Sequence, residues 1–428
     1  MVRTRFAPSP TGFLHIGSLR TALYAYVMAK HAKGQFILRV EDTDVKREVA
    51  DSVESLKSTL KKFGLVWDEY YLQSERLNIY KNTALKLVSG NYAFYCQCPP
   101  RNAKTDGFSQ VLRDPCRNKN LNSGAIKLKV PDSETVSYFD FVHKKEISWD
   151  TNGVYDATLL KTDGFPTYHL AAMVDDLDMK ITHILRGHDW MPSTPIHLLV
   201  FKYLGGTRPD IGHLSDILSA KTGKKLSKRR DSVMAEDFLK EGYLPEALLN
   251  FVMLLGWAPK DNRELYTLSE FVKEFDINGF QESNPRFEDQ KLKWFNGHYL
   301  RQKPDEELIN LIDFPDKAKL KQILPLIKDR LVVLSDFPAL TDFFFTAPSI
   351  SSDPSISFDH LRFAIENYDK LVKGELIDDI KNKGWKIGDF FMSLRIAICG
   401  TRSTPPITET MLVLGRDETI KRLTASQA

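Results

Sequence analysis

The sequence predicts an α/β fold, with an open parallel sheet in the N-terminal part of the chain and helices in the C-terminal part. The first observation is the order of strand, helix and strand over residues 3–6, 19–28 and 35–40, which is the start of a βαβ unit. The second is the helical spacing of apolar residues in the C-terminal third, at Leu320, Ile323, Leu324, Ile327, Leu331 and Leu334.

Residues 7–17 connect the first strand to the first helix and carry the clearest functional signal. Pro8, Pro10 and Gly12 exclude a helix through this turn. The helix begins just after it, so His15 and Gly17 lie near a helix N-terminus, where backbone N–H groups and the helix dipole favour anions. The segment therefore predicts a phosphate-binding turn.

Composition limits the classes of protein without selecting one. The chain has 428 residues, with 59 basic and 56 acidic side chains, a net charge of +3 that is compatible with local basic patches. Its four cysteines are too few and too unevenly placed for a disulfide framework, which favours a reducing compartment. The sequence shows neither an apolar run long enough for a bilayer nor a signal segment, so we expect a cytoplasmic protein without membrane contact.

Charged residues follow two predicted strands at the edge where open α/β sheets bind ligands. Glu41 ends the strand 35–40 and is a candidate partner for an ammonium group, whereas Asp44 is expected only to cap the helix 49–63. Arg186 ends the β-branched strand 181–186, and Asp189 follows it. We expect these side chains to face the same crevice.

A second basic motif lies at residues 221–230, with the sequence Lys-Thr-Gly-Lys-Lys-Leu-Ser-Lys-Arg-Arg. Lysine-rich runs are usually solvated faces. Leu226 and Ser227 within the run favour a loop in which Lys225 and Lys228 balance phosphate charge and Ser227 donates a hydrogen bond.

The two motifs together resemble the signatures of class I aminoacyl-tRNA synthetases, and the prefix Phe-Ala-Pro-Ser-Pro-Thr-Gly resembles the glutamyl-tRNA synthetases in particular. The resemblance implies catalytic roles for His15, Lys225 and Lys228, and binding of ATP by Gly17, Asp189, Ser227 and Lys228. It implies binding of glutamate by Arg5, Ser9, Glu41, Tyr168 and Arg186. Within this set, Glu41 takes the α-ammonium group and Arg5 discriminates the side-chain carboxylate of glutamate from the amide of glutamine. Ala172 departs from the family, whose members commonly carry Asn there.

The resemblance also implies the architecture. We expect a Rossmann-like parallel sheet in two halves, an inserted acceptor-stem-binding domain, a helical linker domain and an all-α anticodon-binding domain. The predicted segments are 1–73 and 162–233 for the catalytic halves, 74–161 for the insertion, 234–303 for the linker and 304–428 for the anticodon domain.

Some members of the family hold zinc in the insertion through a Cys-x-Cys pair and a later Cys-x-His pair. Here Cys96 and Cys98 form the first pair, but Cys116 is followed by Asn118 where the histidine would stand. An amide is a poor zinc ligand, so we expect no zinc and interpret the three cysteines as buried, inert thiols.

The resemblance implies ATP-dependent ligation of L-glutamate to tRNA(Glu) through a glutamyl-adenylate, with Mg²⁺ accompanying ATP and the chain acting as a monomer. Three alternatives are weighed. A glutaminyl enzyme would carry a Pro-Glu-Pro-Asn style of prefix and a β-barrel tail, and a tRNA-modifying glutamyl paralogue would lack an anticodon domain. A catalytically inactive tRNA-binding protein would be expected to lose His15 or Lys228, and both are present.

Overall fold

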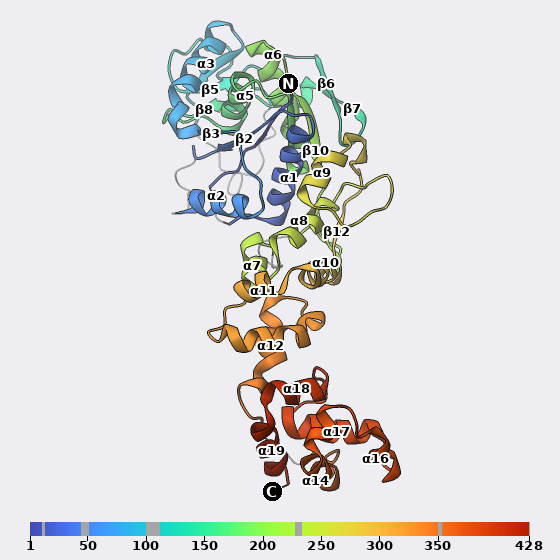
Figure 1. The fold of residues 1–428 in the computed structure, drawn as a ribbon. Coiled ribbons are helices and arrows are strands. Elements are labelled where there is room, and N and C mark those ends of the chain that lie inside the picture. Colours follow the sequence, from blue (N-terminus) through green and yellow to red (C-terminus); the bar gives the residue numbers. More distant parts are fainter. Residues whose placement is uncertain (11–12, 44–50, 100–111, 227–232, 350–352, 428) are drawn as a thin grey trace. The chain divides into compact units, whose positions relative to one another are not determined.

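The computed structural model describes residues 1–10, 13–43, 51–99, 112–226, 233–349 and 353–427 (Figure 1). The chain forms two compact units. The first contains residues 1–239 and 248–289, and the second contains residues 240–247 and 290–428. The division into five functional segments stays a prediction.

The first unit is built on a seven-stranded sheet with the order β3-β2-β1-β9-β10-β6-β7. All neighbouring strands run parallel except the last pair, β6 and β7. In sheet order, the strands are β3 (Glu69–Leu72), β2 (Gln35–Val40), β1 (Arg3–Phe6), β9 (His183–Gly187), β10 (Asp210–Leu214), β6 (Thr135–Asp140) and β7 (Lys145–Asp150). The predicted strands at 3–6 and 35–40 are confirmed to the residue, and the one at 181–186 begins two residues later.

The position of β1 determines where a ligand can enter. The chain passes from β1 to β2 on one side, and much later returns to β9 on the other side of β1. The strand order therefore reverses at β1, and such a reversal opens a crevice at the carboxyl ends of the strands. The helix α1 (Ile16–His31) follows β1, so its N-terminus also faces that edge.

Five helices of the first unit accompany these strands: α1, α2 (Ser52–Lys62), α3 (Leu77–Ser89), α5 (Tyr168–Asp178) and α6 (Thr194–Leu204). The α5 helix follows β8 (Thr158–Leu160) in the chain and begins at Tyr168. Its apolar residues Leu170, Ala171 and Ala172 are buried because α5 packs into the main core.

The predicted insertion contains a second, three-stranded sheet of β4 (Ala93–Cys96), β5 (Ala125–Leu128) and β8 (Thr158–Leu160), paired antiparallel. The same stretch of chain also supplies β6 and β7, which extend the main sheet. Ile126 and Leu159 share one hydrophobic core with Ile37 and Ile211 of the main sheet. The insertion is therefore continuous with the catalytic core in its packing.

The chain between the sheet and the second unit is mainly helical, as predicted. It contains α7 (Ala235–Lys240), α8 (Pro245–Met253) and α9 (Leu268–Glu274), together with a short parallel pair of β11 (Leu218–Ser219) and β12 (Arg286–Phe287). The α9 helix begins at a capping box in which Thr267 and Glu270 satisfy each other's backbone N–H groups.

The second unit is helical throughout the residues that the structure describes. Its helices are α10 (Asp289–Gln302), α11 (Asp305–Leu311), α12 (Lys317–Ile327), α13 (Phe337–Thr341), α14 (Phe358–Glu366), α15 (Tyr368–Val372), α16 (Ile377–Asn382), α17 (Ile387–Cys399), α18 (Ile407–Leu414) and α19 (Arg416–Ala425). The α18 helix starts after Pro406 and ends at Gly415, where φ is 84°.

The apolar pattern from Leu320 to Leu334 predicts a longer helix than the structure contains. The α12 helix ends at Ile327, and residues 328–330 form one turn of 3₁₀ helix. Leu331 still lies fully buried in the same core, because the turn returns the chain to it. The apolar spacing therefore continues past the end of α12 because Leu331 is buried in the same core, although it is no longer part of that helix.

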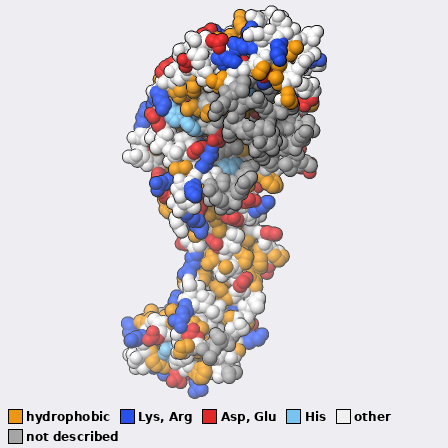
Figure 2. Space-filling model, turned by 180° about the vertical axis from the view of Figure 1, so that it is seen from behind, with side chains coloured by type: hydrophobic (Ala, Val, Ile, Leu, Met, Phe, Trp, Pro, Cys, Tyr) orange, Lys and Arg blue, Asp and Glu red, His pale blue; other side chains and the backbone are white. Residues whose placement is uncertain are grey.

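The charge distribution agrees with the small net charge. On the face drawn in Figure 2, Lys and Arg side chains alternate with Asp and Glu side chains. Within the described ranges, no helix combines the length and the apolar character needed to cross a membrane.

Candidate active site

A cavity of about 410 Å³ opens at the carboxyl ends of β1, β2 and β9, where the strand order reverses. Six of the predicted site residues line it, namely Arg5, Ser9, His15, Glu41, Tyr168 and Arg186. These residues come from positions 5 to 186 in the sequence, and the fold brings them together. Ser227 and Lys228 lie outside the described residues.

His15 is the N-cap residue of α1, and its orientation is set by the backbone. Its Nδ1 accepts a hydrogen bond of 2.9 Å from the N–H of Gly17. A neutral imidazole that accepts at Nδ1 carries its proton on Nε2, so Nε2 is a donor. A Cβ on residue 17 would lie 3.2 Å from this Nδ1, so glycine leaves room for the ring.

Glu41 follows β2 and is a buried carboxylate with an incomplete set of partners. Its Oε1 lies 3.5 Å from Nη2 of Arg39 but accepts no hydrogen bond among the described residues. Burial raises the pKa of Glu41 to about 7, against the opposing effect of Arg39 and Arg5. A ligand ammonium group in the cavity would give Oε1 the donor that it lacks.

Arg5 is already paired with a carboxylate that sequence analysis missed. Its Nε and Nη2 donate to the two oxygens of Asp176 at 3.0 and 3.4 Å, and Arg39 donates to the same carboxylate at 2.7 Å. Burial opposes ionisation of Asp176, but the two arginines together hold its pKa below the ordinary value. One edge of Arg5 is therefore occupied, and its charge is largely balanced within the protein.

In contrast to Arg5, Arg186 is held by neutral groups. It is 4% exposed, and its Nε, Nη1 and Nη2 donate to His213, His197 and Thr194 at 2.8–2.9 Å. All three partners are neutral, and among the described residues no carboxylate lies within ion-pair distance of Arg186. Burial accordingly lowers the pKa of this guanidinium. The site therefore presents a buried positive charge that lacks a protein counter-ion.

A chain of buried, hydrogen-bonded groups next to Arg186 determines which ring nitrogens of His213 and His197 accept hydrogen bonds from it. Asp140, at the end of β6, accepts from Nδ1–H of His213 at 2.7 Å and from the hydroxyl of Tyr138 at 2.9 Å. His213 therefore keeps a lone pair at Nε2 for Arg186. On the other side, Nε2–H of His197 donates to Nδ1 of His169 at 3.0 Å.

The protonation of these histidines is consistent with that network. Burial lowers the pKa of His213 and of His169 to about 4, and it lowers the pKa of His197 well below the ordinary value. The rings therefore stay neutral at physiological pH. Sequence reasoning missed Asp140, His197 and His213, because isolated histidines in apolar stretches carry no signal of a shared partner.

Aromatic packing closes one side of the cavity. The ring of Tyr168, at the start of α5, stacks on Trp190 with centroids 3.9 Å apart and also contacts His197 edge-on. Trp190 lines the cavity although the sequence analysis did not single it out. Tyr168, Trp190 and Arg186 thus line the same cavity.

Asp189 and Lys225, two further predicted site residues, are not among the residues that line this cavity, and they pair with each other. Nζ of Lys225 donates to both oxygens of Asp189 at 2.6–2.7 Å and lies 2.9 Å from Asp216. The basic motif is thereby anchored to the segment that follows β9. A phosphate-binding role for Lys225 requires exchange of these carboxylates for phosphate oxygens.

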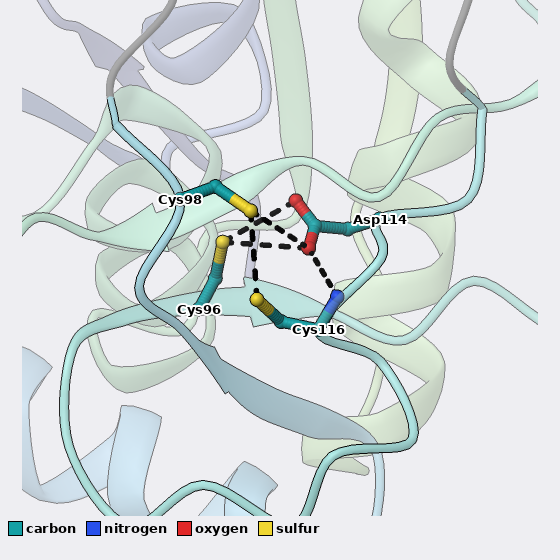
Figure 3. A group of neighbouring side chains, drawn as sticks. All are labelled: Cys96, Cys98, Asp114 and Cys116. Atoms are coloured by element: carbon teal, nitrogen blue, oxygen red, sulfur yellow. Dashed lines mark hydrogen bonds between the residues drawn. The ribbon is translucent and has the colours of Figure 1, made fainter.

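The three cysteines of the insertion do not match the description of buried, inert thiols. Cys96 and Cys116 are buried, but Cys98 is exposed because β4 ends at Cys96. Figure 3 shows the three thiols and the carboxylate of Asp114 pointing toward one another. Asn118, on which the zinc prediction depended, is exposed, and Asp114 is the further donor at the cluster.

Comparisons with known proteins agree with the fold. The family model for the catalytic domain of class I tRNA synthetases (E and Q) matches residues 1–294, and a model for an anticodon binding domain matches residues 290–426. Glutamate–tRNA ligases of Clostridioides difficile and Alkaliphilus metalliredigens are 36% and 34% identical, over 99% of this chain and 98% of each relative.

Solved structures give the same result. A glutamate tRNA ligase from Elizabethkingia meningosepticum, in complex with its amino acid, matches with a TM-score of 0.88 at 33% identity. A glutamate-tRNA synthetase from Elizabethkingia anophelis matches with a TM-score of 0.90 at 32% identity, and both matches cover 99% of each chain. The family model, the relatives and the solved structures agree, and the chain belongs to the class I tRNA synthetases of the E and Q group.

Proposed function

We propose that this chain is a glutamate–tRNA ligase, which joins L-glutamate to tRNA(Glu) at the expense of ATP. The observation that carries the proposal is that Glu41 and Arg186 line the same cavity. One is a buried carboxylate oxygen without a hydrogen-bond donor, and the other is a buried guanidinium without a carboxylate. An amino acid that carries an ammonium group and an extra carboxylate complements both.

In this proposal, Glu41 and Ser9 bind the α-ammonium group, while Arg186, Tyr168 and Arg5 receive carboxylate oxygens. Arg186 is the residue best suited to the side-chain carboxylate, because its charge is not balanced within the protein. Glutamine would leave that guanidinium uncompensated in a buried site, which disfavours glutamine by about 10²–10³ fold. This assignment shifts the main discrimination from Arg5 to Arg186.

The first chemical step needs no protein nucleophile. The α-carboxylate of glutamate attacks the α-phosphorus of ATP, the bond to the β-phosphate oxygen breaks, and pyrophosphate leaves. Nε2–H of His15 donates to the α-phosphate as negative charge builds on it, near the N-terminus of α1. Mg²⁺ bound with ATP would offset part of the phosphate charge.

The remaining ATP contacts are proposed from the motifs. Gly17 lets the adenine and ribose approach the backbone, and Asp189 lies near the ribose. Lys225, Ser227 and Lys228 balance the charge of the leaving pyrophosphate. In the second step, a ribose hydroxyl at the end of the tRNA attacks the glutamyl carbonyl, and AMP leaves.

The helical second unit is proposed to bind the anticodon arm of the tRNA, which its match to an anticodon binding domain supports. We further propose that the enzyme acts as a monomer, as the resemblance to the family implies. The substrates ATP and tRNA place the activity in the cytoplasm.

The test is attachment of labelled glutamate to purified tRNA(Glu) by the full-length chain, with glutamine and omission of ATP as controls. We expect base-labile, ATP-dependent labelling by glutamate alone. Pyrophosphate exchange is expected only when tRNA is present. Robust exchange without tRNA would favour the tRNA-modifying paralogue, and labelling by neither amino acid would favour the inactive tRNA-binding protein.

A further inference from the structure

The turn that carries His15 and the basic segment that carries Lys225 lie far apart in the sequence, but the fold attaches both to one helix. That helix is α1, and His15 is its N-cap residue. The attachment at the start of the basic segment depends on one side chain, Arg20. We propose that Arg20 is a positioning residue, which holds Lys225 in place relative to His15 while the adenylate forms. This inference rests on the proposed function, because it names a further residue for that reaction.

Arg20 is a buried arginine that donates to backbone carbonyl groups of two other segments. It is 4% exposed and lies five residues after His15, which places it about 7.5 Å further along the axis of α1. Its Nη1 donates to the carbonyl oxygen of Leu255 at 3.0 Å, and its Nη2 donates to the carbonyl oxygen of Ser215. The planar guanidinium therefore joins α1 to both segments with one fixed geometry, which the ammonium group of lysine cannot reproduce.

A buried charge at this place has an energetic cost. Burial lowers the pKa of Arg20, although Tyr24 and Asp216 oppose that shift. Within the part of the chain that the structure describes, no carboxylate forms an ion pair with Arg20. Neutral donors could satisfy the same carbonyl groups without burying a charge. The rigid fork of the guanidinium is thus what distinguishes Arg20 from a simple hydrogen-bond donor.

The contact with Ser215 is connected to Lys225 by a short hairpin. Ser215 is the first residue after β10, and the chain enters the basic segment directly after it. The N–H of Leu226 donates to the carbonyl oxygen of Ile217 at 2.9 Å, and Nζ of Lys225 lies 2.9 Å from the carboxylate of Asp216. The hairpin keeps Lys225 joined to Ser215 even when its ammonium group exchanges Asp216 for a phosphate oxygen.

The end of the basic segment is attached to α1 in a different way. The N–H of Ile16 donates to the carbonyl oxygen of Val233 at 2.9 Å, and the N–H of Ala235 donates to the carbonyl oxygen of Leu14 at 2.8 Å. These hydrogen bonds flank His15 and use backbone groups alone. Among the described residues, the start of the segment makes no backbone hydrogen bond to α1. Its position therefore depends on the side-chain contact.

The position of Lys225 matters for the adenylate step because two groups act on one triphosphate. His15 is proposed to donate to the α-phosphate, and Lys225 is proposed to balance the charge of the leaving pyrophosphate. A misplacement of about 1 Å can cost about 10²-fold in rate. The contact of Lys225 strengthens as pyrophosphate leaves, so a loss of position should lower kcat more than it raises KM.

The first test is kinetic and uses the full-length chain. Arg20→Lys keeps the positive charge but cannot span both carbonyl groups. We expect ATP–pyrophosphate exchange in the presence of tRNA to slow by about 10–100 fold, while KM for glutamate changes by less than about threefold. If KM for glutamate rose as much as kcat fell, Arg20 would not act on the adenylate step and the proposal would be overturned.

Tyr24→Phe is the matched control. Tyr24 lies on α1 one turn after Arg20, and its hydroxyl is 3.0–3.1 Å from the carbonyl oxygens of Leu255 and Met253, with no hydrogen bond to Ser215 among the described residues. The variant should lower Tm but keep kcat within about threefold of the unmodified chain. An equal loss of kcat in Tyr24→Phe and Arg20→Lys would mean that only stability is affected, and the proposal would fail.

The second test asks whether Arg20 acts through Lys225. Lys225→Met removes the ammonium group that Arg20 is proposed to position. Adding Arg20→Lys to Lys225→Met should therefore lower kcat by less than about a further threefold. If the two separate losses multiplied instead, Arg20 would act independently of Lys225, against the proposal. Should Arg20→Lys not fold, Arg20→Gln keeps an N–H donor without a buried charge and carries the same expectations.

The third measurement does not depend on ligase activity. Hydrogen exchange without substrates reports how firmly each segment is held. Arg20→Lys should speed exchange in residues 217–226 and leave the N–H of Ile16 protected, whereas Tyr24→Phe should leave residues 217–226 unchanged. Unchanged exchange of that hairpin in Arg20→Lys would overturn the proposal. If the unmodified chain charged no tRNA while the variants showed the expected exchange, the proposed function would be wrong but the attachment through Arg20 would stand.

Discussion

Nε of Arg186 donates a 2.9 Å hydrogen bond to Nε2 of His213, and this contact joins the ligand cavity to a buried carboxylate that lies behind it. Because Asp140 holds the proton of His213 on Nδ1, the imidazole always offers Arg186 an acceptor. The guanidinium is thus held by neutral groups and keeps its charge for the ligand. Asp140 and His213 are positioning residues in the proposed reaction.

The first prediction concerns His213. His213→Phe removes the acceptor and should raise KM for glutamate by about 10–100 fold with a smaller change in kcat, because a hydrogen bond to a charged group contributes roughly 1.5–3 kcal/mol. His213→Gln keeps an acceptor and should restore part of the loss. Steady-state kinetics of tRNA charging measure both.

His183 provides the matched control. It lies on the neighbouring strand β9, three residues before Arg186, and contacts Thr182 and Asp210 away from the cavity. His183→Gln should leave KM for glutamate unchanged. If His213→Phe changed kcat and KM no more than this control does, Arg186 would not depend on His213.

The second prediction separates Arg186 from Arg5. Arg186→Gln should lower kcat/KM for glutamate by about 10²–10³ fold, because the variant lacks the buried positive charge that binds the side-chain carboxylate. For the same reason, its preference for glutamate over glutamine should be smaller. Arg5→Gln should preserve more of the preference, because Asp176 already balances the charge of Arg5. Parallel charging assays with glutamate and glutamine give both ratios. If Arg5→Gln lost more of the preference for glutamate over glutamine than Arg186→Gln did, Arg5 would be the main discriminating residue.

The sequence predicted the parts of this site that local patterns encode. The turn 7–17, Glu41 at the end of β2 and Arg186 at the end of β9 each follow a recognisable strand or precede a helix, and strand ends meet at one edge of a parallel sheet. The pairing of β1 with β2 follows from the single helix that connects them, whereas β9 pairs with β1 only after the long intervening insertion.

The partners of those residues could not be predicted in the same way. Asp176 lies 171 positions from Arg5, and Asp140 lies 73 positions from His213. No local periodicity relates such pairs, because their contact is set by sheet order and helix packing. Asp175 and Asp176 did carry a weak signal, since they directly follow the apolar run Leu170–Val174 of α5 and require partners where they are buried.

The third prediction concerns the carboxylate shared by Arg5 and Arg39. Asp176→Asn removes the counter-charge of two buried guanidinium groups and should lower the free energy of unfolding of the first unit by about 3–5 kcal/mol. Urea unfolding followed by fluorescence measures the change. Asp178→Asn, on the same helix and 58% exposed, should change it by less than about 1 kcal/mol. If the two variants lowered the free energy of unfolding equally, the buried ion pairs of Asp176 with Arg5 and Arg39 would stabilise the fold no more than an exposed ion pair does.

The last prediction uses the ionisation of Glu41. Burial raises the pKa of this carboxyl to about 7, so it is neutral below that pH and charged above it. Only the charged form pairs with the α-ammonium group of glutamate. We therefore expect kcat/KM for glutamate to fall as the pH decreases through about 7. Glu41→Gln should have a low kcat/KM for glutamate at pH 8, and its kcat/KM should not change with pH between pH 6 and 8.

The same shift predicts the opposite effect on stability. A carboxyl whose pKa is higher in the folded than in the unfolded chain destabilises the fold progressively as the pH rises from its ordinary value of 4.5 to about 7. Without glutamate, Glu41→Gln should therefore have a higher Tm than the unmodified chain at pH 8, and the difference should shrink at pH 5.5. A Tm that is lower for the variant at pH 8 would show that Glu41 stabilises the fold, and its role as an ammonium receptor with an incomplete set of partners would not stand.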